Sequence, residues 1–440
     1  MNLQRTLSFV LALALPLGVA LGRPLTLEDA QRRALEANPG LRAKKLEIAV
    51  AKAQSAQAVG RHFGEVDFVS TYNTYNDARL VRPIAGPLNP AKMGAMPFDE
   101  NQFHFGLSWQ IPLLASGKLI FGDRIAKDME RMANASYAHA RHELCYNVRA
   151  AYRNLLVLRH AIEAVEAYEK ALEEDANAAQ LKVKVEALAP VDAQKVAFAL
   201  EGARAQKAGL LAQRQAAEAM LAALMGEDPP ADGFTVEDLP DEPPSLPSLQ
   251  DGHLLEIAKA QRQDLKAARE SLMAAQHRRD QARWSFFIPE LGIQGTWLGH
   301  VAPSVSGALQ TFDFGVYLKF PLLIGMTRWF ATRETRAEWQ AKALQVRALE
   351  LEIASQVTDA LGRLDAAKAQ FEAAIVRRKL GHEVARVEHL KFEQGSGRIE
   401  DYLSARAQEV EGEAFYWQSR YNLETAKDYL DFVIERGGEP

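Results

Sequence analysis

Two twelve-residue stretches decide the fold of this 440-residue chain: FHFGLSWQIPLL (Phe103–Leu114) and FDFGVYLKFPLL (Phe312–Leu323). In both, every second residue is apolar over about ten residues, and the residues between are polar, charged or glycine, so the period is that of a β-strand. Such alternation is typical of a strand in a lipid-facing barrel. The side chains expected to face lipid are Phe103, Phe105, Leu107, Trp109, Phe312, Phe314, Val316 and Leu318.

The likeness of the two stretches indicates an internal duplication. Pro112 corresponds to Pro321, at an offset of 209 residues, and Phe63 corresponds to Phe287, at an offset of 224. These two offsets differ by 15 residues, and the difference falls in the loop between the two strands of each pair. The loop of the first repeat (76–101) is long and rich in Pro and Gly, and that of the second repeat (299–310) is shorter. Long loops on one side of a barrel are tolerated because they face solvent.

The chain is expected to contain four strands, at about 65–75, 102–111, 290–297 and 311–320. Four strands cannot close a barrel, and open sheet edges in hydrocarbon would leave backbone groups unpaired. Copies of the same chain in a ring would supply the missing partners. Three copies would give twelve strands, an even number within the range known for membrane barrels.

The N-terminal sequence and the composition indicate where the protein is located and which ligands it does not bind. The stretch 1–22 has Arg5 before an apolar run and small residues before a cleavage point, which predicts a signal peptide and a mature chain that starts near Arg23. With 52 basic and 57 acidic residues the net charge is −5, which gives no electrostatic case for nucleic acid. The single Cys145 cannot form an internal disulfide.

Helices are expected over most of the remaining chain. Two very long ones, at about 118–186 and 328–393, carry apolar residues at heptad spacing. Each would extend roughly 100 Å, far more than a globular core needs. Shorter helices are expected at about 26–62, 191–225, 249–286 and 400–436, and a Pro-rich, acidic linker at 227–247. The predicted domains are thus 23–226 and 248–440, one for each repeat, on either side of that linker.

No stretch of the sequence indicates an enzyme. It has no Gly-rich phosphate loop, no nucleophile elbow and no HExxH motif. His139 and His142 could share a helix face, as could other His and Glu pairs, but such pairs are common on charged helices. We therefore expect no catalytic residue, no cofactor and no metal site.

At this point the chain resembles the outer-membrane efflux proteins of the TolC family. The likeness rests on the LTLEDA opening (Leu25–Ala30), Asn38-Pro39, the strand that ends in Pro112-Leu113-Leu114, and the segment from Phe392 to Gly437. It implies a trimeric, twelve-stranded outer-membrane barrel continued by a long α-helical tunnel through the periplasm. It also implies docking to a periplasmic adaptor protein and an inner-membrane pump, in a tripartite efflux or type I secretion system.

The resemblance also implies a periplasmic gate. Asp401 matches the first acidic gate residue of close relatives, and Asp192 matches a carboxylate that accepts closing bonds from an Arg and a Tyr. Those donor positions are Gly397 and Phe392 here, so Arg398 is the candidate replacement donor. Gly395, Gly397 and Pro190 are expected in the turns of the helical hairpins.

One alternative from another class stays open from the residues themselves. An exported coiled-coil scaffold in the periplasm, without a pore, could carry the same strands as a small soluble sheet. Extraction behaviour would separate the two, because a barrel protein leaves the membrane only with detergent. Neither the transported substrate nor the class of pump follows from the sequence.

Overall fold

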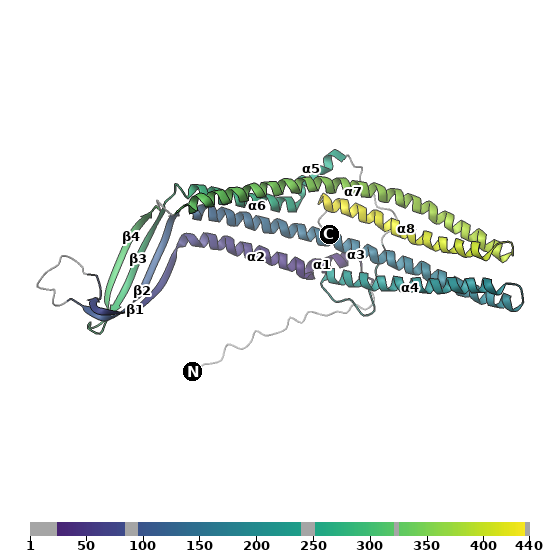
Figure 1. Ribbon diagram of the computed structural model, residues 1–440, viewed down its shortest axis with the longest axis horizontal. Coiled ribbons are helices and arrows are strands. Elements are labelled where there is room, and N and C mark those ends of the chain that lie inside the picture. Colours follow the sequence, from purple (N-terminus) through teal and green to yellow (C-terminus); the bar gives the residue numbers. More distant parts are fainter. Residues whose placement is uncertain (1–23, 84–95, 239–250, 321–324, 436–440) are drawn as a thin grey trace, which may run out of the picture. The chain divides into compact units, whose positions relative to one another are not determined.

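The computed structural model describes residues 24–83, 96–238, 251–320 and 325–435 (Figure 1). They cluster into two units, which we describe separately. The sheet unit comprises Leu35–Tyr146, Ser245–Gln370 and Leu423–Pro440, and the hairpin unit comprises Met1–Ala34, Asn147–Pro244 and Phe371–Asn422. The signal peptide predicted at 1–22 lies outside the described residues.

The sheet unit contains one antiparallel sheet in the order β1-β2-β3-β4 (Figure 1). Its strands are β1 (Glu65–Leu80), β2 (Phe98–Ala115), β3 (Glu290–Val301) and β4 (Leu309–Lys319). Four strands were expected, and their starts or ends extend beyond the predicted bounds, most of all in β1 and β2. Within the described strands, β1 and β4 pair on one side only, so the sheet has two open edges.

The strand register gives this sheet one apolar and one polar face. Leu107 pairs with Phe68 on one side and with Trp297 on the other, and Trp297 pairs with Phe312. Because side chains alternate along a strand, the eight residues predicted to face lipid all lie on this face. The opposite face carries polar pairs: Asp67 with Ser108, Gln110 with Gln294, and Thr296 with Asp313.

The helices repeat with the two offsets seen in the sequence. They are α1 (Leu27–Ala37), α2 (Pro39–Gly60), α3 (Lys118–Lys184), α4 (Pro190–Met225), α5 (Asp251–Gln261), α6 (Gln263–Trp284), α7 (Thr327–Glu393) and α8 (Ile399–Val433). Helices α3 and α7 each contain 67 residues. Within the described ranges, no helix has both the length and the apolar character needed to cross a bilayer.

The prediction of one helix over 26–62 and another over 249–286 was wrong, because both are broken. The backbone of Asn38 is not helical (ψ 121°), as expected for the residue before Pro39. Its side chain caps the start of α2. Arg262 takes the same backbone conformation (ψ 123°) without a following proline. Its side chain is buried and binds both Asp264 and Gln356 of α7, so a tertiary contact holds the second break.

The first described part of the predicted linker packs against the hairpin unit. Val236 is buried and forms a parallel bridge with Leu25. The Tyr152 hydroxyl lies 2.7 Å from the carbonyl oxygens of both Leu25 and Glu237. Burial raises the pKa of Tyr152 to about 12. The domain boundaries at 227 and 247 stay a prediction, since the described residues end at 238 here.

Candidate functional site at the turns of the helical hairpins

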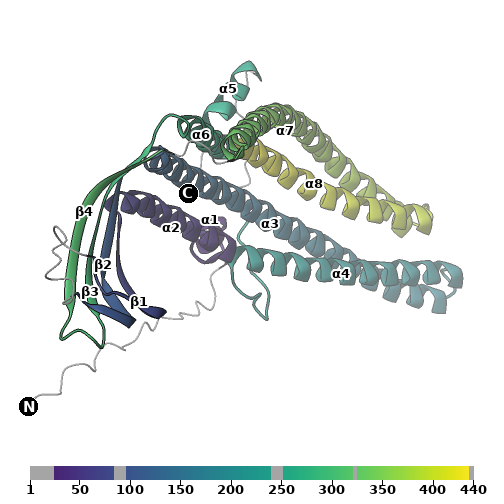
Figure 2. The same cartoon turned by 60° about the vertical axis from the view of Figure 1, so that its left-hand side comes forward.

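The hairpin unit is built from two antiparallel helix pairs, α3 with α4 and α7 with α8 (Figure 2). Both long helices end in the same hydrogen-bonded turn. The Ala187 amide donates to the Lys182 carbonyl (2.8 Å), and the Ser396 amide donates to the Lys391 carbonyl (2.9 Å). This six-residue closure is the Schellman motif, which requires a left-handed residue just before the donor. Gly395 (φ 69°) fills that position in one turn and Glu186 (φ 61°) in the other.

Glu186 is therefore under backbone strain that its repeat equivalent avoids. A left-handed conformation is unfavourable for a residue with a Cβ atom but not for glycine. We expect Glu186→Gly to stabilise the hairpin by about 1 kcal/mol. Gly395→Ala should destabilise it by a similar amount, because the strain is then introduced at the other turn. Unfolding midpoints of both variants would check this, and a destabilised Glu186→Gly protein would contradict it.

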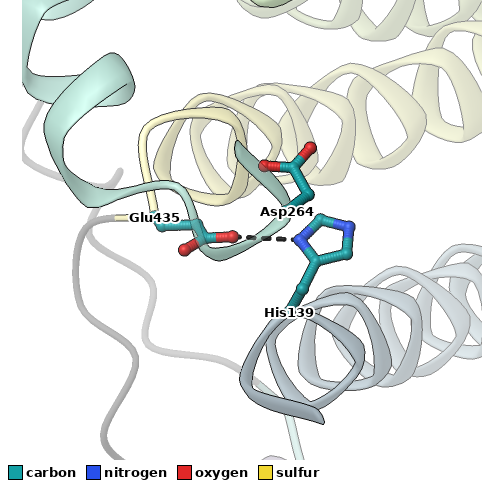
Figure 3. Close-up of side chains that lie close together, drawn as sticks. All are labelled: His139, Asp264 and Glu435. Atoms are coloured by element: carbon teal, nitrogen blue, oxygen red, sulfur yellow. Dashed lines mark hydrogen bonds and ion pairs between the residues drawn. The ribbon is translucent and has the colours of Figure 1, made fainter. Parts of the chain in front are cut away.

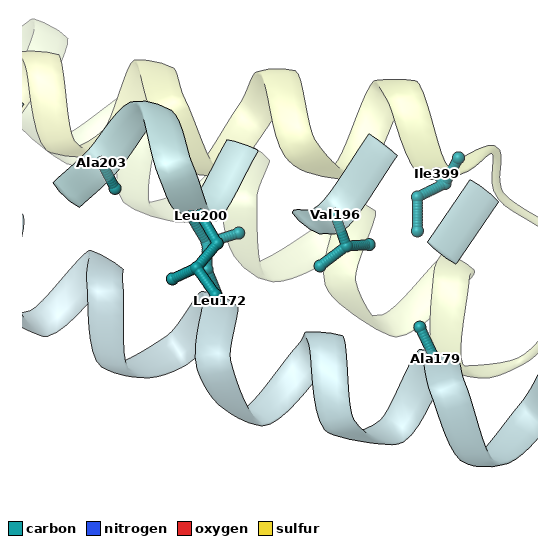
Figure 4. Close-up of a cluster of buried hydrophobic side chains, with 6 residues drawn as sticks. All are labelled: Leu172, Ala179, Val196, Leu200, Ala203 and Ile399. Atoms are coloured by element: carbon teal, nitrogen blue, oxygen red, sulfur yellow. The ribbon is translucent and has the colours of Figure 1, made fainter. Parts of the chain in front are cut away.

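Apolar side chains from three helices pack behind the turns (Figure 4). Partly buried Phe392 and Leu403 cover this cluster. Since α8 contributes to the same core as α3 and α4, the two hairpins are held together near their turns. The cluster consists of Leu172 and Ala179 from α3, Val196, Leu200 and Ala203 from α4, and Ile399 from α8.

Tyr402 adds a polar contact between α8 and α3 at this core. Its side chain is buried, its hydroxyl donates to Asp175 Oδ2 (2.7 Å), and its ring stacks on Phe392 with 5.2 Å between centroids. Burial, together with the carboxylate of Asp175, raises the pKa of Tyr402 far above its ordinary value. The hydroxyl thus stays protonated and remains a donor. This pair could not be predicted from the sequence, because 227 residues separate its members.

Lys195 joins the first turns of α4 and α8. Its Nζ donates to Asp192 Oδ1 (3.0 Å), one turn away on α4, and to a carboxylate oxygen of Glu400 on α8. These hydrogen bonds, that to Glu400 first, raise the pKa of Lys195. The spacing of Asp192 and Lys195 is readable in the sequence, but Glu400 belongs to the other repeat and could not have been chosen from it.

The predicted gate residues differ in their surroundings. Asp192 accepts a hydrogen bond from Lys195. The predicted donor, Arg398, is exposed and does not donate to it. Asp401 is exposed in the first turn of α8, and no described side chain pairs with it. At Gly397 an added Cβ would lie 2.9 Å from the Cβ of Lys391, so the tight turn leaves no room for a larger residue. Pro190 is the first residue of α4, where its missing N–H costs nothing.

A second polar cluster lies in the sheet unit and joins the interior of α3 to the start of α6 and to the residues just after α8 (Figure 3). His139 Nδ1 is 3.0 Å from Glu435 Oε1, and Glu435 Oε2 accepts from the amide of Gln263 at the start of α6 (2.8 Å). Both carboxylate oxygens of Asp264 accept from Arg262. Each of these four oxygens therefore has a donor already, and a metal ion would have to displace one.

Protonated His139 should stabilise this cluster. The hydrogen bond to Glu435 and the charge of Asp264 raise the pKa of His139, against the opposing effects of burial and Arg262. A raised folded-state pKa means a contribution that is complete below the unfolded value and is lost as pH rises through the folded value. We expect His139→Gln to lower the thermal midpoint more at pH 5.5 than at pH 8.5. An equal loss at both pH values would show that only packing matters.

Comparisons with known proteins support one family. The family model described as outer membrane efflux protein matches residues 31–227 and 254–434. No curated protein sequence matches the chain. A membrane protein from Pseudomonas aeruginosa is similar in structure (TM-score 0.78, 20% identity), and the alignment covers 93% of each chain.

Two outer-membrane proteins have the same fold. The CmeC outer membrane channel of Campylobacter jejuni has a TM-score of 0.77 and 16% identity, over 93% of this chain and 85% of that one. The outer membrane protein VceC of Vibrio cholerae has a TM-score of 0.75 and 16% identity, over 94% and 97%. The chain has two matched repeats, a four-stranded sheet and two helices of 67 residues. It belongs to the outer membrane efflux protein family and is a non-enzymatic outer membrane efflux channel of the TolC type.

Proposed function

We propose that three copies of this chain close a twelve-stranded barrel and form one continuous duct. The observation that carries this proposal is the sheet with one apolar face and two open edges. An isolated sheet of this kind would leave backbone groups unpaired in lipid, whereas β1 of one copy and β4 of the next can satisfy each other. The apolar face, with the eight residues named above, then contacts outer-membrane lipid.

The family and the long hairpins support a more specific role. In this proposal the duct is the outer-membrane component of a tripartite efflux or type I secretion system. A periplasmic adaptor protein and an inner-membrane pump would deliver the substrate to the hairpin turns. The alternative of a scaffold without a pore is set aside, because the family to which the chain belongs is one of channels.

We assign the periplasmic gate to the hairpin turns, with Asp401 as its principal charge. Threefold symmetry would bring three exposed Asp401 carboxylates around one axis, and a ring of this kind attracts cations. Asp192 is the weaker candidate, since Lys195 already neutralises it. Because Lys195 also binds Glu400, it takes the locking role that was predicted for Arg398.

Single-channel recording in a planar bilayer tests the proposal. Detergent-purified wild type should conduct as an oligomer that dissociates only on heating, and millimolar divalent cation should block it. Asp401→Ala should conduct but require at least about tenfold more cation for block, since one carboxylate per copy is lost. Glu383→Ala removes an exposed acid of α7 away from the turns and is the matched control.

The outcomes separate the parts of the proposal. Block that is unchanged in Asp401→Ala would refute the gate but leave the duct. Well-folded protein that never conducts, and that stays soluble without detergent, would refute the duct as well.

A further inference from the structure

All four strands of the sheet unit join their helices at the same end of the sheet (Figure 1). Ala115 at the end of β2 pairs with Glu290 at the start of β3, and Glu290 pairs with Lys319 at the end of β4. Strand β1 begins at this end as well, because it is antiparallel to β2. The four junctions therefore lie at one level along the strands. We call them the junction belt, which comprises residues 61–65, 115–124, 283–290, 319–320 and 325–334.

Large apolar side chains are exposed throughout the junction belt. In the single chain Phe63 is 77% exposed and Phe287 is 75% exposed. The exposed apolar residues of the belt are Phe63, Ile120, Trp284, Phe286, Phe287, Phe320, Met326, Trp329 and Phe330. Aromatic side chains collect where the hydrocarbon of a membrane meets water, at the level of the lipid headgroups. We therefore place the junction belt at that level, between the strands and the charged helices.

The junction belt is positively charged, whereas the whole chain is negative. It contains seven basic and four acidic residues, against a net charge of −5 for the chain. Glu290 already lies 3.9 Å from Lys118 and 3.8 Å from Lys319, and Asp123 lies 2.9 Å from His62. The basic residues are Arg61, Lys118, Arg124, Arg283, Lys319, Arg328 and Arg333. Because the carboxylates of the belt are too few to neutralise its cations, the belt attracts anions.

The starts of α3 and α7 add to this attraction. The first turn of α3 contains Lys118 and that of α7 contains Arg328, and neither turn contains an acidic residue. Helices α4 and α8, by contrast, carry Asp192 and Glu400 in their first turns. The dipole of a helix makes its N-terminus unfavourable for a cation and favourable for an anion. An external anion at the belt would therefore relieve repulsion at both helix starts.

Two arginines of the belt lie against its aromatic rings. The Cζ atom of Arg328 is 5.9 Å from the ring centroids of both Phe286 and Phe320. The Cζ atom of Arg333 is 4.4 Å from that of Trp329. A guanidinium stacked on a ring can still donate from its edge, and its paired N–H groups match the oxygens of a phosphate. The rings thus fix two phosphate-binding groups at the membrane surface.

We propose that the junction belt binds the headgroups of anionic phospholipids in the leaflet on the helix side of the membrane. The aromatic side chains anchor the belt at the interface, and Lys118, Arg328 and Arg333 contact the headgroup phosphates. Basic residues at this level select anionic over zwitterionic lipids, because only the anionic headgroups carry a net charge. The inference rests on the proposed membrane-spanning sheet and adds a class of ligand to it.

Competition between two lipids that differ only in their headgroups tests this inference. The full-length protein in non-ionic detergent is mixed with equal amounts of dioleoylphosphatidylglycerol and dioleoylphosphatidylcholine, and native mass spectrometry counts the bound molecules of each. We expect the wild type to retain at least about fivefold more phosphatidylglycerol. Arg328→Gln with Arg333→Gln should lower this preference to less than about twofold.

A matched control removes two other arginines of α7. Arg347 and Arg363 are 65% and 61% exposed and lie farther along the helix, and Arg363 also stacks on a ring, that of Tyr429. Arg347→Gln with Arg363→Gln should keep the wild-type preference for phosphatidylglycerol. An equal loss in both double variants would overturn the inference, since any cation of the helix would then serve.

Two results with the wild type alone would also overturn the inference. One is equal retention of the two lipids. The other is displacement of phosphatidylglycerol by millimolar inorganic phosphate, because the belt would then be a site for a free anion. The proposed duct is judged separately. A conducting, heat-modifiable oligomer without lipid preference would refute only the lipid site, whereas a protein that prefers phosphatidylglycerol but never conducts would refute only the duct.

Discussion

Gly106→Ala is expected to prevent β2 and β3 from pairing in their observed register. A Cβ atom at this position would lie 1.9 Å from the carbonyl oxygen of Trp297 and 2.8 Å from the Cα of Leu298. Both are backbone atoms of the neighbouring strand, so no side-chain rotation can relieve the overlap. Since β2 is also paired with β1, it cannot move away freely. We expect a loss of at least about 3 kcal/mol in the free energy of unfolding.

The repeat supplies a matched control for this substitution. Gly315 occupies the equivalent position in β4, where an added Cβ meets no atom within 4 Å. Gly315→Ala should therefore leave β4 paired with β3 within the chain, and any loss that it causes would arise at the edge of β4 that the proposed trimer pairs with β1 of the next copy. Thermal unfolding of both variants would measure the difference. Wild-type stability of Gly106→Ala would mean that β2 and β3 can separate locally at little cost, contrary to the register described here.

Phe314→Arg should be the second large change. Phe314 lies in the middle of β4 on the apolar face, and its side chain is 63% exposed in the single chain. If this face contacts lipid, an arginine there must be taken into the hydrocarbon region, at a cost of about 2–4 kcal/mol near the bilayer midplane. The expected result is a lower yield of heat-modifiable oligomer in the outer membrane.

Gln294→Arg is the control for the opposite face. Gln294 is exposed on the neighbouring strand β3, and its backbone partners are Gln110 and Gly315. Its side chain would face the water-filled interior of the proposed barrel, so an added charge should be tolerated. Equal losses from Phe314→Arg and Gln294→Arg would count against the assignment of the two faces.

Much of this architecture could be predicted because its signals are local or repeated. The alternating residues from Phe103 onward specify a strand with one apolar face, whichever strand becomes its neighbour. The heptad spacing specifies long helices in the same way. Because the sequence is duplicated, each of these patterns occurs twice, and equivalent helices begin at the offset between the repeats. For example, α4 and α8 begin at Pro190 and Ile399, 209 residues apart.

Two contacts could not be predicted because they join elements that are distant in sequence. The break at Asn38 is readable from Pro39, but at the equivalent break the buried Arg262 binds Gln356, which is 94 residues away. Arg398 was the predicted donor to Asp192, whereas Asp192 accepts from Lys195 on the same helix, and Lys195 also reaches Glu400 of the other repeat, 205 residues away. A helix places residues three or four apart on one face, but it does not specify which other helix that face will meet.

The sequence by itself determined the strand pattern, the long helices, the duplication and the family likeness, because periodicity and order are properties of the chain alone. Tertiary structure decided which side chains meet: Tyr402 with Asp175, Lys195 with Glu400, and Glu435 with both His139 and the start of α6. It also decided that an added Cβ at Gly106 would overlap the backbone of the neighbouring strand, whereas one at Gly315 meets no atom of the same chain within 4 Å. The physical reason is that close contact and charge pairing depend on distances between atoms of different elements, and only packing sets those distances.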